Sequence, residues 1–168
     1  MSPWFKRPEV SSPLTEATVH FVCASTAIYA TRRQIWDFIK PPENAALLSP
    51  GVVSGFRAPD VEGLGEIQVF ISVRAGIEQV SALEVMEEIP LELAVTRTLG
   101  DADQAARMRY FIHPGDNGAM ILDIGQYFTI PVEDAENLAK YEQHYWLGCQ
   151  QLVDRVKAFF EQSGARRF

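Results

Sequence analysis

Residues 119–163 read AMILDIGQYFTIPVEDAENLAKYEQHYWLGCQQLVDRVKAFFEQS, a strand-like segment followed by a long helical one. In the first part apolar and polar residues alternate, which predicts a strand over about 119–130 with one face turned to a core. In the second part apolar residues recur every three or four positions, which predicts an amphipathic helix over about 134–163. The apolar stripe of this helix comprises Leu138, Tyr141, Tyr145, Cys149, Leu152, Val156 and Phe159. We therefore expect the helix to cover the apolar face of a sheet.

The rest of the sheet is predicted from turn signals. They divide the preceding segment into strands at about 52–58, 65–73, 77–88, 92–99 and 105–113. The gaps between these strands are so short that sequence neighbours must pair antiparallel. A further strand is expected at 18–28, followed by two short helices at about 32–39 and 43–48. The predicted fold class is α+β, a seven-stranded curved antiparallel sheet wrapped around a long C-terminal helix, with two short helices between its first two strands.

Length and composition set the domain organisation. The chain has 168 residues, which fits one domain. Three prolines among polar residues mark positions 1–16, which we interpret as an irregular N-terminal arm. We expect residues 17–168 to form this one folded domain.

Charge and cysteine content narrow the function classes. The net charge of −7 argues against nucleic acid as a partner, because that affinity depends on neutralising phosphates. Long apolar runs and a secretory signal are not visible, so we expect no membrane span and a cytoplasmic location. The two cysteines are expected to be free thiols. The three histidines lack the spacing of metal ligands, so neither a metal site nor a cofactor is expected.

The order of elements and several local motifs resemble a known superfamily. The motifs are Ile28-Tyr29-Ala30 before Ile35-Trp36-Asp37-Phe38-Ile39, then Pro42-Glu43, Pro50-Gly51-Val52, Gly63 with Gly65, and Val85-Glu87-Ile89-Pro90 with Leu93. In this order they resemble the SRPBCC, or START-like, superfamily with its helix-grip fold, and within it the polyketide cyclase/dehydrase-like group. The resemblance covers about residues 18–163.

The resemblance implies a sheet with strand order 1-7-6-5-4-3-2 and a cavity between its concave face and the C-terminal helix. Members of the superfamily bind lipids, sterols, hormones or polyketides there, and some catalyse ring closure or dehydration. The superfamily has no universal catalytic motif, so no catalytic residue is assigned. Our leading hypothesis is a protein that binds a small apolar or aromatic molecule. The alternatives are a cyclase or dehydratase acting on such a molecule, and an interaction domain with a filled core, so whether the chain is an enzyme stays open.

Six residues are candidates for ligand contact, each with a structural alternative. Arg97 lies at two-residue spacing with Leu93, Val95 and Leu99, so its side chain should share their face of the strand. We expect it to point into the concave side, as a ligand anchor or as an ion-pair partner. Gln126 lies among apolar neighbours and needs a partner, either a ligand or a backbone group. The inward-facing tyrosines are expected to line the cavity or to fill the core; they are Tyr110, Tyr141 and Tyr145.

The sixth candidate is Gly148, a helical glycine at the flank of the stripe, whose missing side chain leaves room for a ligand or for a crossing strand. Beside it, Trp146 and Leu147 form an apolar pair suited to self-association, so a homodimer is one alternative to a monomer. The glutamates of the central strands are interpreted as solvated; they are Glu78, Glu84, Glu87, Glu88 and Glu92.

Overall fold

The computed structural model describes residues 18–59, 61–100 and 106–165, with no side-chain detail for residues 164 and 165. The arm predicted at residues 1–16 lies outside the described part. The elements, in chain order, are β1 (Val19–Ile28), α1 (Arg32–Ile39), the 3-10 helix η1 (Pro42–Asn44), α2 (Ala45–Leu48), β2 (Val52–Arg57), β3 (Ile67–Arg74), β4 (Ile77–Ile89), β5 (Leu93–Thr98), β6 (Arg107–Pro114), η2 (Asp116–Gly118), β7 (Met120–Thr129), η3 (Val132–Asn137) and α3 (Leu138–Ala165).

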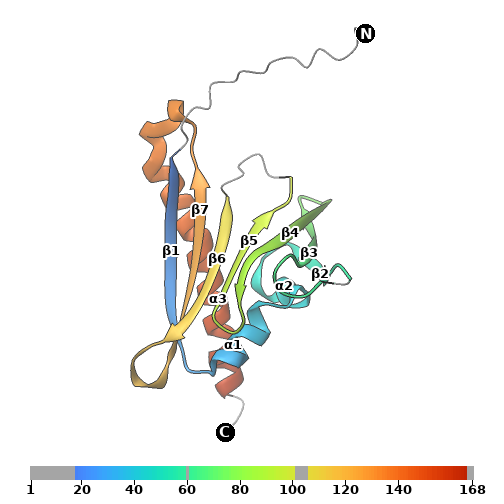
Figure 1. The fold of residues 1–168 in the computed structure, drawn as a ribbon, viewed down its shortest axis with the longest axis vertical. Helices are drawn as coiled ribbons and strands as arrows, with labels where there is room; N and C mark the ends of the chain where they lie inside the picture. Colours follow the sequence, from blue (N-terminus) through green and yellow to red (C-terminus); the bar gives the residue numbers. More distant parts are fainter. Residues whose placement is uncertain (1–17, 60, 101–105, 166–168) are drawn as a thin grey trace, which may run out of the picture.

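The seven strands form one antiparallel sheet with the order β1-β7-β6-β5-β4-β3-β2. Figure 1 shows this sheet curving around α3, so the predicted fold class is confirmed. The register pairs Tyr110 with Ile124, and Ile124 with Ala24. Because paired residues point to the same side of a sheet, these three side chains share the concave face.

Helix α1 begins and ends where the sequence predicts. Thr31 caps it, and the reciprocal bonds between Thr31 and Gln34 complete a capping box. Its inner side buries Ile35, Trp36 and Phe38. Lys40 still has helical geometry, and the helix ends after it because Pro41 adopts an extended conformation and has no backbone N–H to continue the helical hydrogen bonds.

Helix α3 packs mainly on β1 and β7, at one side of the sheet (Figure 1). Its fully buried residues are Cys149, Val153 and Val156, of which Val153 was not among the predicted stripe. Near its C-terminal end, Phe159 stacks on Phe38 of α1 at 3.9 Å between ring centroids. The concave face over the central strands is therefore closed by α1 and α2 together with the second half of α3. No helix in the described ranges is long and apolar enough to cross a membrane.

Candidate functional site

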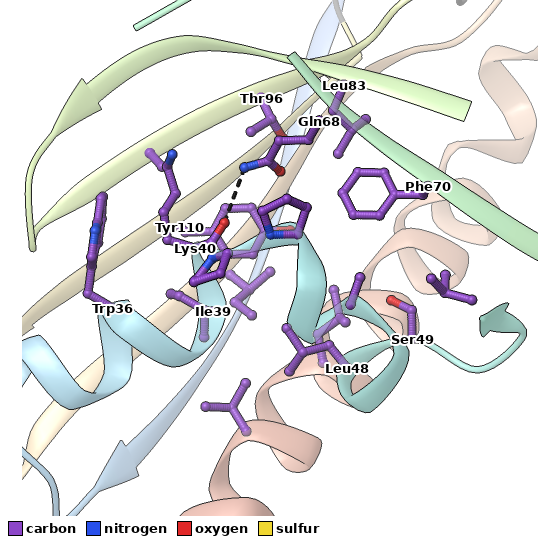
Figure 2. Close-up of a pocket in the computed structure, with 18 of the residues that line it drawn as sticks. Trp36, Ile39, Lys40, Leu48, Ser49, Gln68, Phe70, Leu83, Thr96 and Tyr110 are labelled. Atoms are coloured by element: carbon purple, nitrogen blue, oxygen red, sulfur yellow. Dashed lines mark hydrogen bonds between the residues drawn. The ribbon is translucent and has the colours of Figure 1, made fainter. Parts of the chain in front are cut away.

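A cavity of about 240 Å³ lies between the concave face of the sheet and the helices α1 and α2. Figure 2 shows Gln68, Leu83 and Thr96 on the strand side of this cavity and Leu48 and Ser49 on the helix side. Its lining is mainly apolar and comprises Trp36, Ile39, Lys40, Pro41, Pro42, Ala45, Leu48, Ser49, Val52, Gln68, Phe70, Ser81, Leu83, Ala94, Thr96, Tyr110, Ile124, Leu152 and Val156.

Ser49, Ser81, Thr96 and Tyr110 bring hydroxyl groups to this lining, and those of Thr96 and Tyr110 lie on the central strands β5 and β6. Thr96 is 5% exposed, and its Oγ1 is buried without a hydrogen-bond partner among the described residues. A buried hydroxyl without a partner costs roughly 1–3 kcal/mol. Tyr110 comes from the neighbouring strand β6, and burial, together with the nearby Cys149, raises the pKa of Tyr110 to about 12. Its hydroxyl therefore stays protonated and is a hydrogen-bond donor at neutral pH.

Gln68, another polar side chain of the strand wall, connects the cavity to a buried carboxylate. Gln68 Nε2 donates to the backbone oxygen of Lys40 at 3.1 Å and to Glu66 Oε1 at 2.6 Å. Glu66 itself is fully buried. Its carboxylate also accepts hydrogen bonds from Lys40 Nζ at 3.2 Å and from the backbone nitrogen of Gly63 at 3.1 Å.

The pKa of Glu66 reflects two opposing effects. Burial raises the pKa, but the hydrogen bonds from Gln68 and Gly63 and the charge of Lys40 outweigh burial and leave the pKa of Glu66 lowered. Glu66 is therefore a stable carboxylate that holds Lys40 and Gln68 in position.

Further charges surround Glu66. Arg57 Nε lies 3.3 Å from Glu66 Oε2, and Lys40 Nζ lies 3.0 Å from Glu88 Oε2. Both are ion pairs by distance, although neither Arg57 Nε nor Glu88 Oε2 has the alignment of a hydrogen bond. We call Lys40, Arg57, Glu66 and Glu88 the buried ion cluster.

The sequence analysis missed this cluster and interpreted Glu88 as solvated, which is wrong because its side chain is only 13% exposed. The sequence did contain one signal of a tight turn just before Glu66. Gly63 and Gly65 both adopt positive φ, at 84° and 82°, a conformation that favours glycine. This turn places Glu66 directly after the two glycines and inside the protein. Gln68 lies only two residues after Glu66, but Lys40 and Glu88 come from distant segments, so the sequence alone does not bring the cluster together.

A second hollow, which we call the outer groove, adjoins the cavity. It measures about 490 Å³ and shares Leu48, Ser49 and Leu152 with the cavity lining. Its other lining residues are Pro50, Arg74, Met108, Gln126, His144, Tyr145, Leu147, Gly148, Cys149, Gln151 and Arg155. Most of them come from α3, with Met108 from β6 and Gln126 from β7.

The structure separates the six candidate residues. Only Tyr110 lines the cavity, whereas Gln126, Tyr145 and Gly148 line the outer groove. Gln126 Nε2 donates to the backbone oxygen of Tyr127 at 2.9 Å, and Tyr145 packs on Phe128 at 4.4 Å between ring centroids.

Gly148 and Tyr141 lie in different surroundings. A Cβ added at Gly148 would meet nothing within 4 Å, so this glycine leaves open space in the groove. Tyr141 lies one turn before Tyr145, and its hydroxyl donates to Asp134 Oδ2 at 3.1 Å. This hydrogen bond, with the charge of Asp134, raises the pKa of Tyr141. Tyr141 lines neither the cavity nor the outer groove, but a separate hollow with Asn137, Lys140, His144 and Tyr145.

The expected orientation of Arg97 is wrong. Arg97 directly follows Thr96, whose side chain lines the cavity together with that of Ala94. Successive side chains of a strand point to opposite faces, so Arg97 points to the other face of the sheet. There its Nε and Nη2 donate to Glu84 Oε2 at 3.0 and 2.8 Å. The pattern was ambiguous because β5 is a central strand whose first four residues are all buried, Leu93 through Thr96. When both faces are buried, alternation does not identify the concave one.

The cysteines and potential metal ligands offer no further chemistry in this region. Cys23 and Cys149 are both free thiols, as predicted. Burial raises the pKa of both, that of Cys149 to about 11, so the thiols stay protonated at neutral pH. In the described part of the chain, no group of three or more His, Cys, Asp or Glu side chains is placed to hold a metal ion.

Comparison with known proteins supports the fold. No protein-family model matches the chain, and no curated protein matches it. Solved structures do. Norcoclaurine synthase from Thalictrum flavum, in complex with dopamine and hydroxybenzaldehyde, matches with a TM-score of 0.63 and 12% identity, over 87% of this chain and 88% of the synthase. The major latex-like protein 151 of Panax ginseng matches with a TM-score of 0.61 and 8% identity, over 84% and 97%.

A third solved structure is the di-domain ARO/CYC StfQ from the steffimycin biosynthetic pathway. It matches with a TM-score of 0.65 and 11% identity, over 88% of this chain and 52% of StfQ. At such low identities these similarities establish a shared fold.

Proposed function

We propose that this chain, whose fold is the helix-grip fold of the SRPBCC superfamily, binds a small apolar or aromatic molecule in the cavity between α1, α2 and the concave face of the sheet. The observation that carries the proposal is the Thr96 hydroxyl, buried in the cavity wall without a partner. Ligand sites are typically apolar hollows with a few polar groups that fix orientation. Here Thr96, Tyr110 and Gln68 are those groups.

The size of the cavity limits the ligand. Its volume of about 240 Å³ exceeds the roughly 150 Å³ of an engineered apolar cavity that binds benzene. It lies just below the range of about 300–1,000 Å³ typical of drug-sized ligands. An occupant with one or two aromatic rings, or an aliphatic chain of similar volume, fits within the cavity, and a larger molecule extends into the outer groove.

Binding is better supported than catalysis. Among the described residues, the cavity lining includes no carboxylate and no imidazole, the groups that most often move protons at neutral pH. Lys40 reaches the lining, but its ammonium group contacts Glu66 and Glu88. Tyr110 stays protonated, which suits a hydrogen-bond donor rather than a base.

A fluorescence titration with N-phenyl-1-naphthylamine, a neutral dye that brightens in apolar surroundings, tests the proposal. Ala45 lines the cavity, so Ala45→Leu should fill part of it and weaken dye binding about tenfold or more. Ala82→Leu is the matched control, because Ala82 pairs with Val69 on the other face of the sheet. Equal dye affinity in wild type and Ala45→Leu would overturn the proposal.

A further inference from the structure

The outer groove continues the cavity toward solvent. Leu48, Ser49 and Leu152 line both hollows, so these three side chains form the boundary between them. Figure 2 shows Leu48 and Ser49 on the side of the cavity away from Trp36. A molecule longer than the cavity would therefore extend past Leu48 and Leu152 into the groove.

The groove differs from the cavity in charge. Arg74 at the end of β3 and Arg155 on α3 both line it, together with His144. Among the described residues that line the groove there is no carboxylate. The chain as a whole has 22 acidic and 15 basic residues. A hollow whose charged side chains are all basic therefore differs from the acidic balance of the whole chain.

Within the described part of the chain, the two arginines also lack ionic partners. Arg32, Arg57 and Arg97 each pair with a glutamate. Across residues 18–59, 61–100 and 106–165, neither Arg74 nor Arg155 forms an ion pair. Guanidinium groups stay charged at any working pH and bind carboxylates with paired donors.

We propose that the ligand is an amphiphilic carboxylic acid, whose apolar body fills the cavity and whose carboxylate lies in the outer groove against Arg74 and Arg155. The inference rests on the proposed function and adds the chemical class of the ligand. It also assigns a role to the groove, where Gly148 leaves open space beside the path of the chain.

The test compares acids with alcohols of the same carbon skeleton. Phenylalkanoates from 3-phenylpropanoate to 8-phenyloctanoate, and the matching phenylalkanols, are used to displace N-phenyl-1-naphthylamine at neutral pH. At the chain length that reaches the groove, the acid should bind about tenfold more tightly than the alcohol, because hydrogen bonds between charged groups are the strong ones. The double variant Arg74→Gln/Arg155→Gln should reduce this advantage to less than about twofold and leave the affinity for the alcohol unchanged.

The control is Arg33→Gln/Arg107→Gln, which changes the net charge by the same amount at two exposed arginines that line neither hollow. It should keep the preference for acids, which separates a local effect from the overall charge. Equal binding of acid and alcohol at every length, or an unchanged preference in Arg74→Gln/Arg155→Gln, would overturn the inference while binding in the cavity stands. If neither the dye nor any phenyl compound binds, the proposed function fails as well.

Discussion

Gln68 Nε2 donates to Glu66 Oε1 at 2.6 Å, and this hydrogen bond joins the wall of the cavity to the buried ion cluster. The same nitrogen also donates to the backbone oxygen of Lys40 at the end of α1. One carboxylate therefore positions a strand residue and a helix end that meet in the wall of the cavity. Because Glu66 is hydrogen-bonded to both Gln68 and Lys40, the position of these two residues in the cavity wall depends on the charge of Glu66.

Replacing Glu66 by Gln should destabilise the protein. The change removes the charge that Lys40 and Arg57 face, and a buried ion pair that loses one partner costs about 3–5 kcal/mol. We expect about 3 kcal/mol in urea unfolding, since Lys40 keeps Glu88 as a partner. Glu62→Gln is the matched control, because Glu62 pairs with Arg57 but its side chain is 79% exposed. An equal loss of unfolding free energy in Glu66→Gln and Glu62→Gln would contradict the claim that the buried carboxylate contributes more to stability than the exposed one.

The pH dependence of stability should have a defined sign. The pKa of Glu66 is lowered below its ordinary value of about 4.5 in the folded protein, so the unfolded chain takes up its proton first as the pH falls. The stability that this carboxylate contributes is present in full above the unfolded pKa and is lost as the pH falls through the folded pKa. Urea unfolding of wild type and Glu66→Gln from pH 7 to pH 3 should show a difference that is constant near neutrality and shrinks below about pH 4.5. A difference that grows in acid would contradict this.

Thr96→Val should stabilise the protein without ligand. The change replaces the unpartnered hydroxyl by a methyl group of similar shape, with an expected gain of about 1 kcal/mol in thermal or urea unfolding. It should also weaken binding of 2-naphthol more than binding of naphthalene, because only the former offers a hydrogen bond to Thr96. Thr98→Val, at an exposed position of the same strand, should do neither. Destabilisation by Thr96→Val would mean that the hydroxyl is satisfied.

Arg97→Met should leave ligand affinity unchanged. Arg97 pairs with Glu84 on the face away from the cavity, and both side chains are partly exposed. Such pairs contribute about 0.2–1 kcal/mol, so a loss of roughly 0.5 kcal/mol in unfolding free energy is expected. A double-mutant cycle with Glu84→Gln measures the pair itself. A marked loss of dye affinity in Arg97→Met would show that Arg97 reaches the cavity.

The sequence was most informative where one physical signal dominated. Thr31, a residue suited to cap a helix, and the prolines after Lys40 delimit α1, and the predicted bounds 32–39 are the observed ones. On β7, which is apolar on one side only, the alternation that puts Gln126 among inward-facing residues puts Ile124 on the same face, and Ile124 lines the cavity. On β5, by contrast, both faces are buried, and the same reasoning assigned Arg97 to the wrong side.

The site itself was less accessible to sequence analysis. Tyr141 and Tyr145 were expected at the cavity because the periodicity of α3 marks which side is inward, but not which part of the sheet each turn covers. That depends on α1, whose Phe38 stacks on Phe159 near the C-terminal end of α3. The cavity therefore forms beside the second half of α3, at Leu152 and Val156.

The central claim is that a small apolar molecule occupies the cavity, and methyl NMR tests it most directly. Protein with ¹³C-labelled Ile, Leu and Val methyl groups is titrated with N-phenyl-1-naphthylamine, and shift changes are followed for each methyl group. The largest changes should occur at Ile39, Leu83 and Ile124, which line the cavity. Ile121, on the opposite face of β7, should change little. Changes confined to Ile121 and other methyl groups outside the cavity, or no changes at saturating dye, would contradict the account.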